Sequence, residues 1–241
     1  MRQFKRGGRL AARLESPHRP QVSATATGSD RPRAEAQFQA VKLPWQLSAM
    51  LHCCQCELIS ARSMNFRILD KCSKEEVASL FTSVFSSSEG EQEGRLIGSL
   101  ASALAARTDN QRIIGVGAYE DGSMIGAIFF TRLRFDEPIE AYMLAPVAVS
   151  TAHQGRGIGQ ALIRFGLDEL KNRSVTLVVT YGDPAFYSKA GFQTLSEDVI
   201  QAPLPLSMPE GWLGQHLSGK AIPILKSRPA CVQEFDNPDY W

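Results

Sequence analysis

The stretch VAVSTAHQGRGIGQALIRFGLDEL, residues 147–170, passes from a β-branched segment through closely spaced glycines into a helical pattern. Apolar residues at the spacing of one helix face follow the glycines: Ile158, Ala161, Leu162 and Phe165. The helix is therefore predicted to begin near Gly157. Its first N–H groups have no helical partner and lie at the positive end of the helix dipole. The junction predicts an oxyanion site suited to a phosphate, with the Arg156 side chain available for a charge-assisted contact.

The glycine spacing narrows the kind of phosphate site. Gly155, Gly157 and Gly159 alternate as G-x-G-x-G. A Walker A loop requires G-x-x-x-x-G-K-[ST], and the dinucleotide fingerprint requires G-x-G-x-x-G, so neither nucleotide motif fits. For this stretch alone, a glycine-rich turn without any ligand stays open.

A second strand and helix follow in VTLVVTYGDPAFYSKAGF, residues 175–192. The β-branched run over 175–180 predicts a strand buried on both faces and parallel to the preceding one. Asp183 is placed to cap a short helix, Pro184 suits its first position, and Gly191 can end it. Two parallel strands thus end in turns on the same side of the sheet, where open α/β folds bind ligands.

Two helices are predicted upstream. Residues 72–85 carry one apolar face: Val77, Leu80, Phe81, Val84 and Phe85. Ser73 and Glu76 have the spacing of a capping box. The acidic segment 86–94 interrupts the pattern, which resumes over 96–106. We therefore expect a polar loop between the two helices.

Several strands are predicted around these helices. The segment FRIL, residues 66–69, reads as a short strand. Asp121 and Gly122 separate two apolar runs and favour a tight hairpin. A third strand over 140–149 contains Pro146, whose missing N–H breaks the ladder and marks a bulge or an edge.

Charge divides the 241-residue chain into two parts. Residues 1–63 hold ten Lys and Arg against four Asp and Glu, whereas residues 64–241 hold sixteen against twenty-one. The first part lacks apolar periodicity and is predicted to be a disordered basic extension, either a transit peptide or an upstream segment before a natural start at Met64. Residues 64–241 are predicted to form the folded domain.

Cysteine usage and hydropathy bear on the setting of the protein. Cys53, Cys54 and Cys56 lie together without a second ligand pair at zinc-finger spacing, so no metal site is predicted. The apolar patch over 45–51 is too short for a membrane span. With neither a secretory signal nor a disulfide framework, we expect a cytoplasmic protein without membrane or nucleic-acid partners.

The motifs QGRGIG after VAV, and YSKAGF, resemble the signatures of the GNAT superfamily of acyl-CoA-dependent N-acetyltransferases. The resemblance covers residues 64–194, and APVAV and VTYGDPAFYSKAGF are similar to a bacterial subgroup of predicted N-acetyltransferases. It implies an α/β (α+β) fold with a mixed central sheet flanked by helices, whose splayed parallel strands bind acetyl-CoA as co-substrate. The expected reaction is acetyl transfer by direct attack of a primary amine.

The resemblance also implies a set of site residues. The pantetheine arm would pair with the strand backbone, and the pyrophosphate would rest on the glycine turn: Val147, Ala148 and Val149, then Gln154, Gly155, Arg156, Gly157, Ile158 and Gly159. Tyr187 stands where family members place the tyrosine that protonates the CoA sulfur, with a buried core tyrosine as the alternative. Asp183 stands where many relatives have an Asn that contacts the cofactor, so it either binds cofactor or only caps its helix.

The general base and the acceptor are less constrained. Glu140 is the first candidate base and His153 the second; each is otherwise an ordinary surface group, and a water relay is a third route. The acceptor, a small molecule or a protein amine, would enter beside the loop over 86–94, where Glu89, Glu91 and Glu93 either attract a cation or are only solvated.

Two further questions stay open in the sequence. The alternative function is a non-catalytic acyl-CoA-binding or interaction module that kept the fold. The expected assembly is a monomer or homodimer, and the segment over 231–241 closes the sheet, covers the acceptor site or meets a partner.

Overall fold

The structure, a computed structural model, describes residues 64–241. The predictions made for residues 1–63, including the extension and the cysteine group, lie outside this range. Within it, seven strands form one sheet in the order β1-β2-β3-β4-β5-β7-β6. Their bounds are β1 Met64–Ile68, β2 Ile113–Glu120, β3 Ser123–Leu133, β4 Ala141–Val149, β5 Leu177–Tyr181, β6 Gln193–Thr194 and β7 Trp212–His216.

The sheet is mixed, as predicted. All neighbouring strands run antiparallel except β4 and β5, which are parallel. The β2–β3 hairpin turns at Asp121 and Gly122, whose φ angles of 51° and 82° are the two positive values that a type I′ turn requires. Both the hairpin and the parallel pair expected from the sequence are therefore confirmed.

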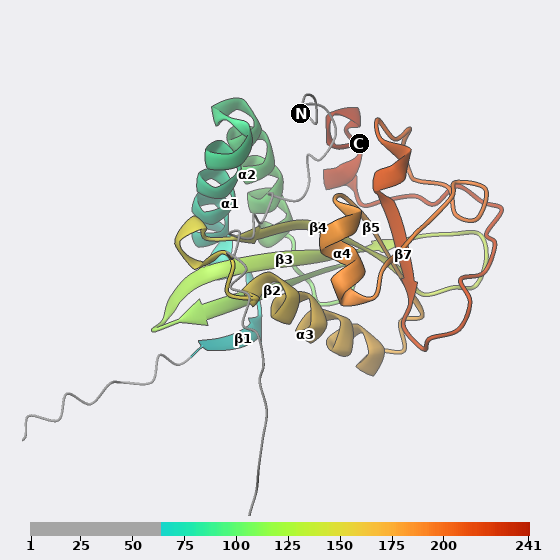
Figure 1. Cartoon of the computed structure of the whole chain (residues 1–241), viewed down its shortest axis with the longest axis horizontal. Coiled ribbons are helices and arrows are strands. Elements are labelled where there is room, and N and C mark those ends of the chain that lie inside the picture. The colour runs from blue at the N-terminus through green and yellow to red at the C-terminus, as the bar shows by residue number, and fades with distance from the viewer. Residues whose placement is uncertain (1–63) are drawn as a thin grey trace, which may run out of the picture. The chain divides into compact units, whose positions relative to one another are not determined.

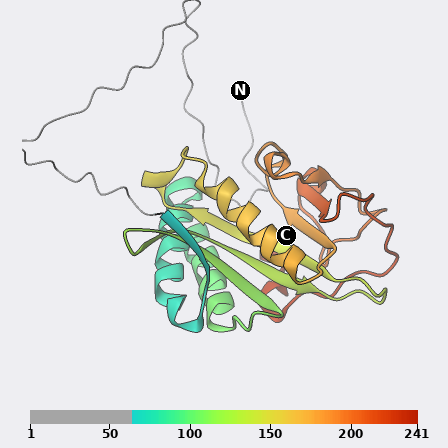
Figure 2. The ribbon, with the colours of Figure 1, turned by 90° about the horizontal axis from the view of Figure 1, so that it is seen from below.

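Helices cover both faces of the sheet. The α-helices are α1 Lys74–Glu89, α2 Glu91–Ala106, α3 Ile158–Asn172 and α4 Pro184–Tyr187. Figures 1 and 2 show α1 and α2 side by side on one face and α3 across the opposite face. Each face has its own apolar core: Phe81, Phe85 and Phe129 pack on the α1–α2 side, and Ile128, Phe130 and Leu162 on the α3 side. These cores hold the sheet between two layers of helix, which is the α/β architecture expected.

The polar loop predicted over 86–94 is wrong, because these residues are helical on both sides of Gly90. Gly90 alone separates α1 from α2, with a φ of 102° that favours glycine. The serines before it tolerate the helix: Ser87 Oγ donates to the Ser83 carbonyl oxygen at 2.8 Å. Glu91 and Glu93 lie in the first turn of α2, where the helix dipole favours acids.

The predicted capping box at the start of α1 is also absent. Residues Lys71–Ser73 form a 3-10 turn, and Ser73 has a φ of −83° and a ψ of 3°, outside the extended conformation of an N-cap. Its hydroxyl donates to Asp70 Oδ1 at 3.3 Å instead. The turn that precedes the helix has therefore redirected the side chain that the spacing with Glu76 suggested as a cap.

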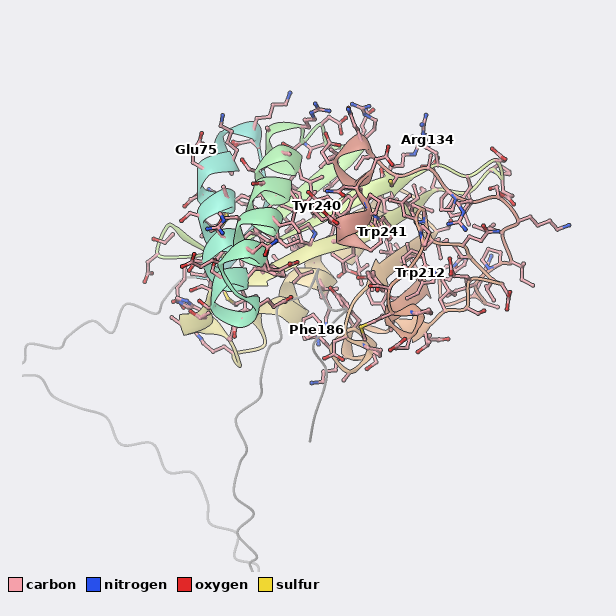
Figure 3. All side chains as sticks on the ribbon, turned by 90° about the horizontal axis from the view of Figure 1, so that it is seen from above. Glu75, Arg134, Phe186, Trp212, Tyr240 and Trp241 are labelled. Atoms are coloured by element: carbon pink, nitrogen blue, oxygen red, sulfur yellow. The ribbon has the colours of Figure 1, made fainter. Side chains whose placement is uncertain are left out.

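The region beyond residue 195 completes the sheet and one core. Strand β7 pairs antiparallel with the whole of β5. The later segment over 231–241 adds no strand but forms two 3-10 turns, Gln233–Phe235 and Pro238–Tyr240. Trp241 stacks on Tyr181 with ring centroids 6.5 Å apart and lies 6.4 Å from Trp212, on the α1–α2 side (Figure 3).

Candidate functional site

Strands β4 and β5 part after a short paired region. Their register runs from Ala141 opposite Leu177 to Leu144 opposite Thr180, and β4 then continues to Val149 without β5. On its other side, β4 shifts register against β3, so that residues 145–146 stand opposite Phe129. The irregularity predicted at Pro146 is thus a bulge, and it falls where the two parallel strands separate.

The turn after β4 presents a run of unused backbone donors. Gly155 and Gly157 have φ angles of 75° and 77°, and Gly157 is the N-cap of α3. Among the described residues, none of the N–H groups of residues 155–160 donates to a backbone carbonyl or a side chain outside helical hydrogen bonds. A Cβ placed on Gly157 would meet no atom within 4 Å. The turn therefore offers donors and open space, as an oxyanion site requires.

Helix α4 begins with the cap that the sequence predicted. Asp183 Oδ1 accepts from the Ala185 N–H at 2.8 Å, Pro184 occupies the first position, and Gly191, with a φ of 92°, ends the following turn. Asp183 thus caps the helix, and its predicted contact with a cofactor stays a prediction. Gln160 Nε2 donates to the Phe186 carbonyl at 2.8 Å and so ties the first turn of α3 to α4.

Tyr187, the last residue of α4, is fully buried. Its ring makes edge contacts with Phe186 and Phe192, at centroid distances of 5.1 and 5.8 Å. Its hydroxyl has no hydrogen-bond partner among the described residues. Burial raises the pKa of Tyr187 well above its usual value, and the neighbouring Thr180 hydroxyl offsets this only in part. The phenol therefore stays protonated at neutral pH.

Tyr187 also marks the place where the strands separate. Thr180, whose hydroxyl acts on Tyr187, donates to the Leu144 carbonyl at 2.8 Å. Thr180 and Leu144 form the last β4–β5 pair. The structure thus brings the predicted acid, Tyr187, to the beginning of the open part of β4.

Glu140 lies elsewhere. It directly precedes β4, is about half exposed and forms an ion pair with Arg132 Nη2 at 2.5 Å. At about 3.3 Å per residue, Glu140 and Val147 are separated by roughly 23 Å of strand. The structure therefore does not bring Glu140 together with the open part of β4, and its role as the base stays a prediction without geometric support.

His153 and Arg156 share a partner that the sequence did not reveal. His153 Nε2 lies 3.1 Å from Glu120 Oε2, and Arg156 Nη2 lies 2.7 Å from Glu120 Oε1. The Arg156 side chain predicted to contact an anion is thus paired with a carboxylate. Glu120 precedes a hairpin turn, where an acidic residue is ordinarily solvated, so no local signal distinguished it.

The acidic residues proposed to attract the acceptor lie on helices rather than on a loop. Glu91 pairs with Arg95 at 3.5 Å within α2. A cavity of about 660 Å³ is lined by residues of α1 and α2 and one from the last 3-10 turn: Glu89, Gln92, Glu93, Arg95, Leu96, Ser99 and Asp239. Its lining mixes both charges, and the acceptor entrance predicted there stays a prediction.

Neither a metal-ligand cluster nor a membrane-spanning helix occurs within residues 64–241. This part of the chain gathers no group of His, Cys, Asp and Glu side chains that could hold a metal ion. None of its helices combines the length and the apolar character needed to cross a bilayer.

Comparison with known proteins places this geometry in a family. The family model of the acetyltransferase (GNAT) domain matches residues 104–194. The uncharacterized N-acetyltransferase YjhQ of Escherichia coli is 29% identical over 174 residues, which cover 69% of this chain and 91% of that protein. The uncharacterized N-acetyltransferase YhbS of the same organism is 31% identical over 119 residues, covering 48% of this chain and 68% of YhbS.

Solved structures share the fold. The GNAT family N-acetyltransferase YhbS from Escherichia coli, in complex with CoA, aligns with a TM-score of 0.62 at 24% identity, covering 73% of this chain and 94% of that one. A GNAT family acetyltransferase from Brucella melitensis, in complex with acetyl-CoA, aligns with a TM-score of 0.56 at 24% identity, covering 73% and 99%. The parted strands, the glycine turn and these relatives agree that the chain belongs to the GNAT superfamily of N-acetyltransferases.

Proposed function

We propose that this chain transfers an acetyl group from acetyl-CoA to a primary amine by direct attack. The observation that carries the proposal is the loss of the β5 neighbour after Leu144, together with the unpaired N–H donors of the glycine turn that follows β4. The pantetheine arm would pair with the backbone of Val147, Ala148 and Val149. The solved neighbours in complex with CoA and acetyl-CoA support this choice of co-substrate.

The pyrophosphate would rest on the turn from Gln154 to Gly159. The open side of Gly157 leaves room for a bulky anion, and the helix dipole of α3 favours its charge. Gln154 Nε2 donates to the Val149 carbonyl at 3.0 Å, which joins the turn to the strand. In this assignment Arg156 contributes its backbone N–H, because its guanidinium is paired with Glu120.

The reaction needs a neutral amine, a polarised thioester carbonyl and a proton for the leaving thiolate. In this proposal, backbone N–H groups of the open part of β4 stabilise the oxyanion. The amine nitrogen forms a bond to the acetyl carbon as the carbon–sulfur bond breaks. The buried Tyr187 hydroxyl then donates its proton to the sulfur and regains one from water.

The proton of the attacking amine needs another route. Glu140 is separated from the open part of β4 by its position and is paired with Arg132. His153, directly before the turn that we assign to the pyrophosphate, contacts Glu120 at the end of β2. We infer that neither residue accepts the proton directly and that water carries it away.

Calorimetry with CoA, followed by thiol release from acetyl-CoA with a panel of amines, tests the proposal. The expected result is binding at a single site and release of CoA with at least one class of amine. The panel contains polyamines, aminoglycosides, amino acids and peptides with free N-termini or lysines. Binding without release by any amine would favour the non-catalytic acyl-CoA-binding module instead, and absence of binding would reject both.

A further inference from the structure

Glu120 is buried, with 7% of its surface exposed, and its carboxylate side chain is as enclosed as that of Glu234, which pairs with Arg107. It is the last residue of β2, directly before the hairpin turn. A buried carboxylate loses hydration that its partners must replace, so its presence requires an explanation. Packing alone does not explain it, because an apolar side chain would fill the same place without that cost.

The two carboxylate oxygens of Glu120 hold two different residues of the glycine turn. Oε2 lies 3.1 Å from His153 Nε2, before the glycines, and Oε1 lies 2.7 Å from Arg156 Nη2, between Gly155 and Gly157. Glu120 itself is fixed in the sheet, where it is in register with Met64 on one side and Ser123 on the other. Glu120, which is fixed in the sheet, therefore contacts the turn through two of its residues.

The turn needs such a support. Gly155 and Gly157 restrict the backbone least of all residue types, and their N–H groups have no described acceptor that would hold them in place. Arg156 stands between them, so its side chain is the natural point at which to fix their orientation. Donors that are already oriented bind an anion without the entropic cost of ordering them.

We propose that Glu120 is the positioning residue of the phosphate site, acting through Arg156 and His153; this rests on the function proposed above. The competing physical effect has the opposite sign, because a carboxylate repels a phosphate and competes with it for Arg156. The two effects differ in sign. If Glu120 positions the turn, its removal weakens CoA binding, whereas if it competes, its removal strengthens binding.

The test compares the wild type with Glu120→Gln, which preserves shape and removes charge. Asp121→Asn is the matched control, because it removes an exposed charge from the adjacent residue of the same hairpin. CoA affinity is measured by calorimetry, and turnover is measured with acetyl-CoA and with S-acetylpantetheine, which lacks the pyrophosphate. We expect Glu120→Gln to weaken CoA binding roughly tenfold, to raise KM for acetyl-CoA, and to leave kcat and turnover of S-acetylpantetheine unchanged. Asp121→Asn should behave as the wild type.

A double-mutant cycle identifies the route of the effect. In an Arg156→Gln background, Glu120→Gln should reduce CoA affinity much less than it does alone, because the contact between Glu120 and Arg156 is already lost. If Glu120→Gln does not fold, Arg156→Gln and His153→Gln remove the same contacts from the other side. Each should then weaken CoA binding while sparing S-acetylpantetheine.

Three results would overturn the proposal while leaving the proposed function intact. They are unchanged CoA affinity, tighter CoA binding, and an equal loss with both thioesters, which would indicate general damage to the fold. If the wild type bound no CoA, the proposed function would fall, and the role of Glu120 with it.

Discussion

The two halves of β4 bury their side chains alike but have different neighbouring strands. Residues Ala141 to Leu144 lie between β3 and β5, whereas residues 145–146 form the bulge and residues 147–149 pair with β3 alone. Side chains are buried along the entire strand. Burial therefore does not distinguish the structural half from the half that we assign to the cofactor. The backbone on the β5 side makes the difference, since only there are ladder positions left for a ligand.

Local features on both strands produce this difference. Pro146 cannot donate to a ladder, and the bulge around it shifts the register against β3. Gly182, directly after β5, does not pair with β4. Its N–H donates to the Gly211 carbonyl at 2.9 Å. The paired half should thus govern stability and the open half should govern binding and turnover, a distinction that mutations can test.

The largest effect is expected from Tyr187→Phe beside the open half. Loss of the hydroxyl removes the proposed general acid, so kcat should fall by roughly 10² to 10⁴ while acetyl-CoA affinity stays similar. Steady-state kinetics of the folded variant measure this. Tyr142→Phe is the matched control in the paired half, where the hydroxyl donates to the Gln111 carbonyl. It should cost about 1 kcal/mol of stability and leave kcat intact; near-normal turnover of Tyr187→Phe would remove Tyr187 from the mechanism.

The paired half should respond in stability instead. Met143 is fully buried in the core under α1 and α2. Met143→Ala leaves a cavity and should lower the free energy of unfolding by about 2–5 kcal/mol. Denaturant titration measures this change, and calorimetry on the folded variant should give the CoA affinity of the wild type. A large loss of affinity would show that the two halves are not separable.

A side chain on the glycine turn should affect both quantities. Gly157→Val would place a branched side chain where the phosphate is proposed to bind, so CoA affinity should fall at least roughly tenfold, or about 1.4 kcal/mol. The φ of 77° should also cost about 1–2 kcal/mol of stability. Gly219→Val is the matched control, because Gly219 has a φ of 73° and equally open surroundings. Equal affinities in the two variants would place the anion elsewhere.

The smallest effect is expected at low pH, near the paired half. Burial alone would raise the pKa of Asp109, but hydrogen bonds from Ile113, Gln111 and Arg112 lower it to about 2 from 3.8. Its contribution is complete above pH 4 and is lost as the pH falls toward 2. Because the group is partly exposed, we expect less than about 1 kcal/mol. Urea titrations between these pH values measure it, and Asp109→Asn should flatten the dependence.

Much of the fold could be predicted from local patterns. The hairpin at Asp121 and Gly122 and the start of α3 near Gly157 each follow from a glycine that permits a positive φ, and the bulge at Pro146 follows from the missing N–H of proline. The segment over 86–94 could not be predicted in this way, since Ser and Glu are compatible with either a loop or an exposed helix. There, the packing of the flanking helices on the sheet determines the helical structure, and local helix propensity does not.

The site was only partly predictable. The sequence indicated the glycine turn and Tyr187, because their motifs are contiguous, and both lie beside the strand opening. The position of Glu140 depends on the strand register, and the burial of Glu120 depends on the turn that folds over it. Such properties arise from tertiary contacts, which local spacing does not encode.

The place of β7 in the sheet has a consequence for the order of synthesis. Strand β7 borders β5 along its whole length, yet it follows β5 and α4 in the chain. When β5 and α4, which carries Tyr187, leave the ribosome, the edge of β5 that faces away from β4 has no partner strand. The ladder on that side cannot form until residues Trp212–His216 emerge. Strands β1 to β5 have already emerged by then, so this edge of β5 is completed late in synthesis and is open to chaperones and to aggregation until that point.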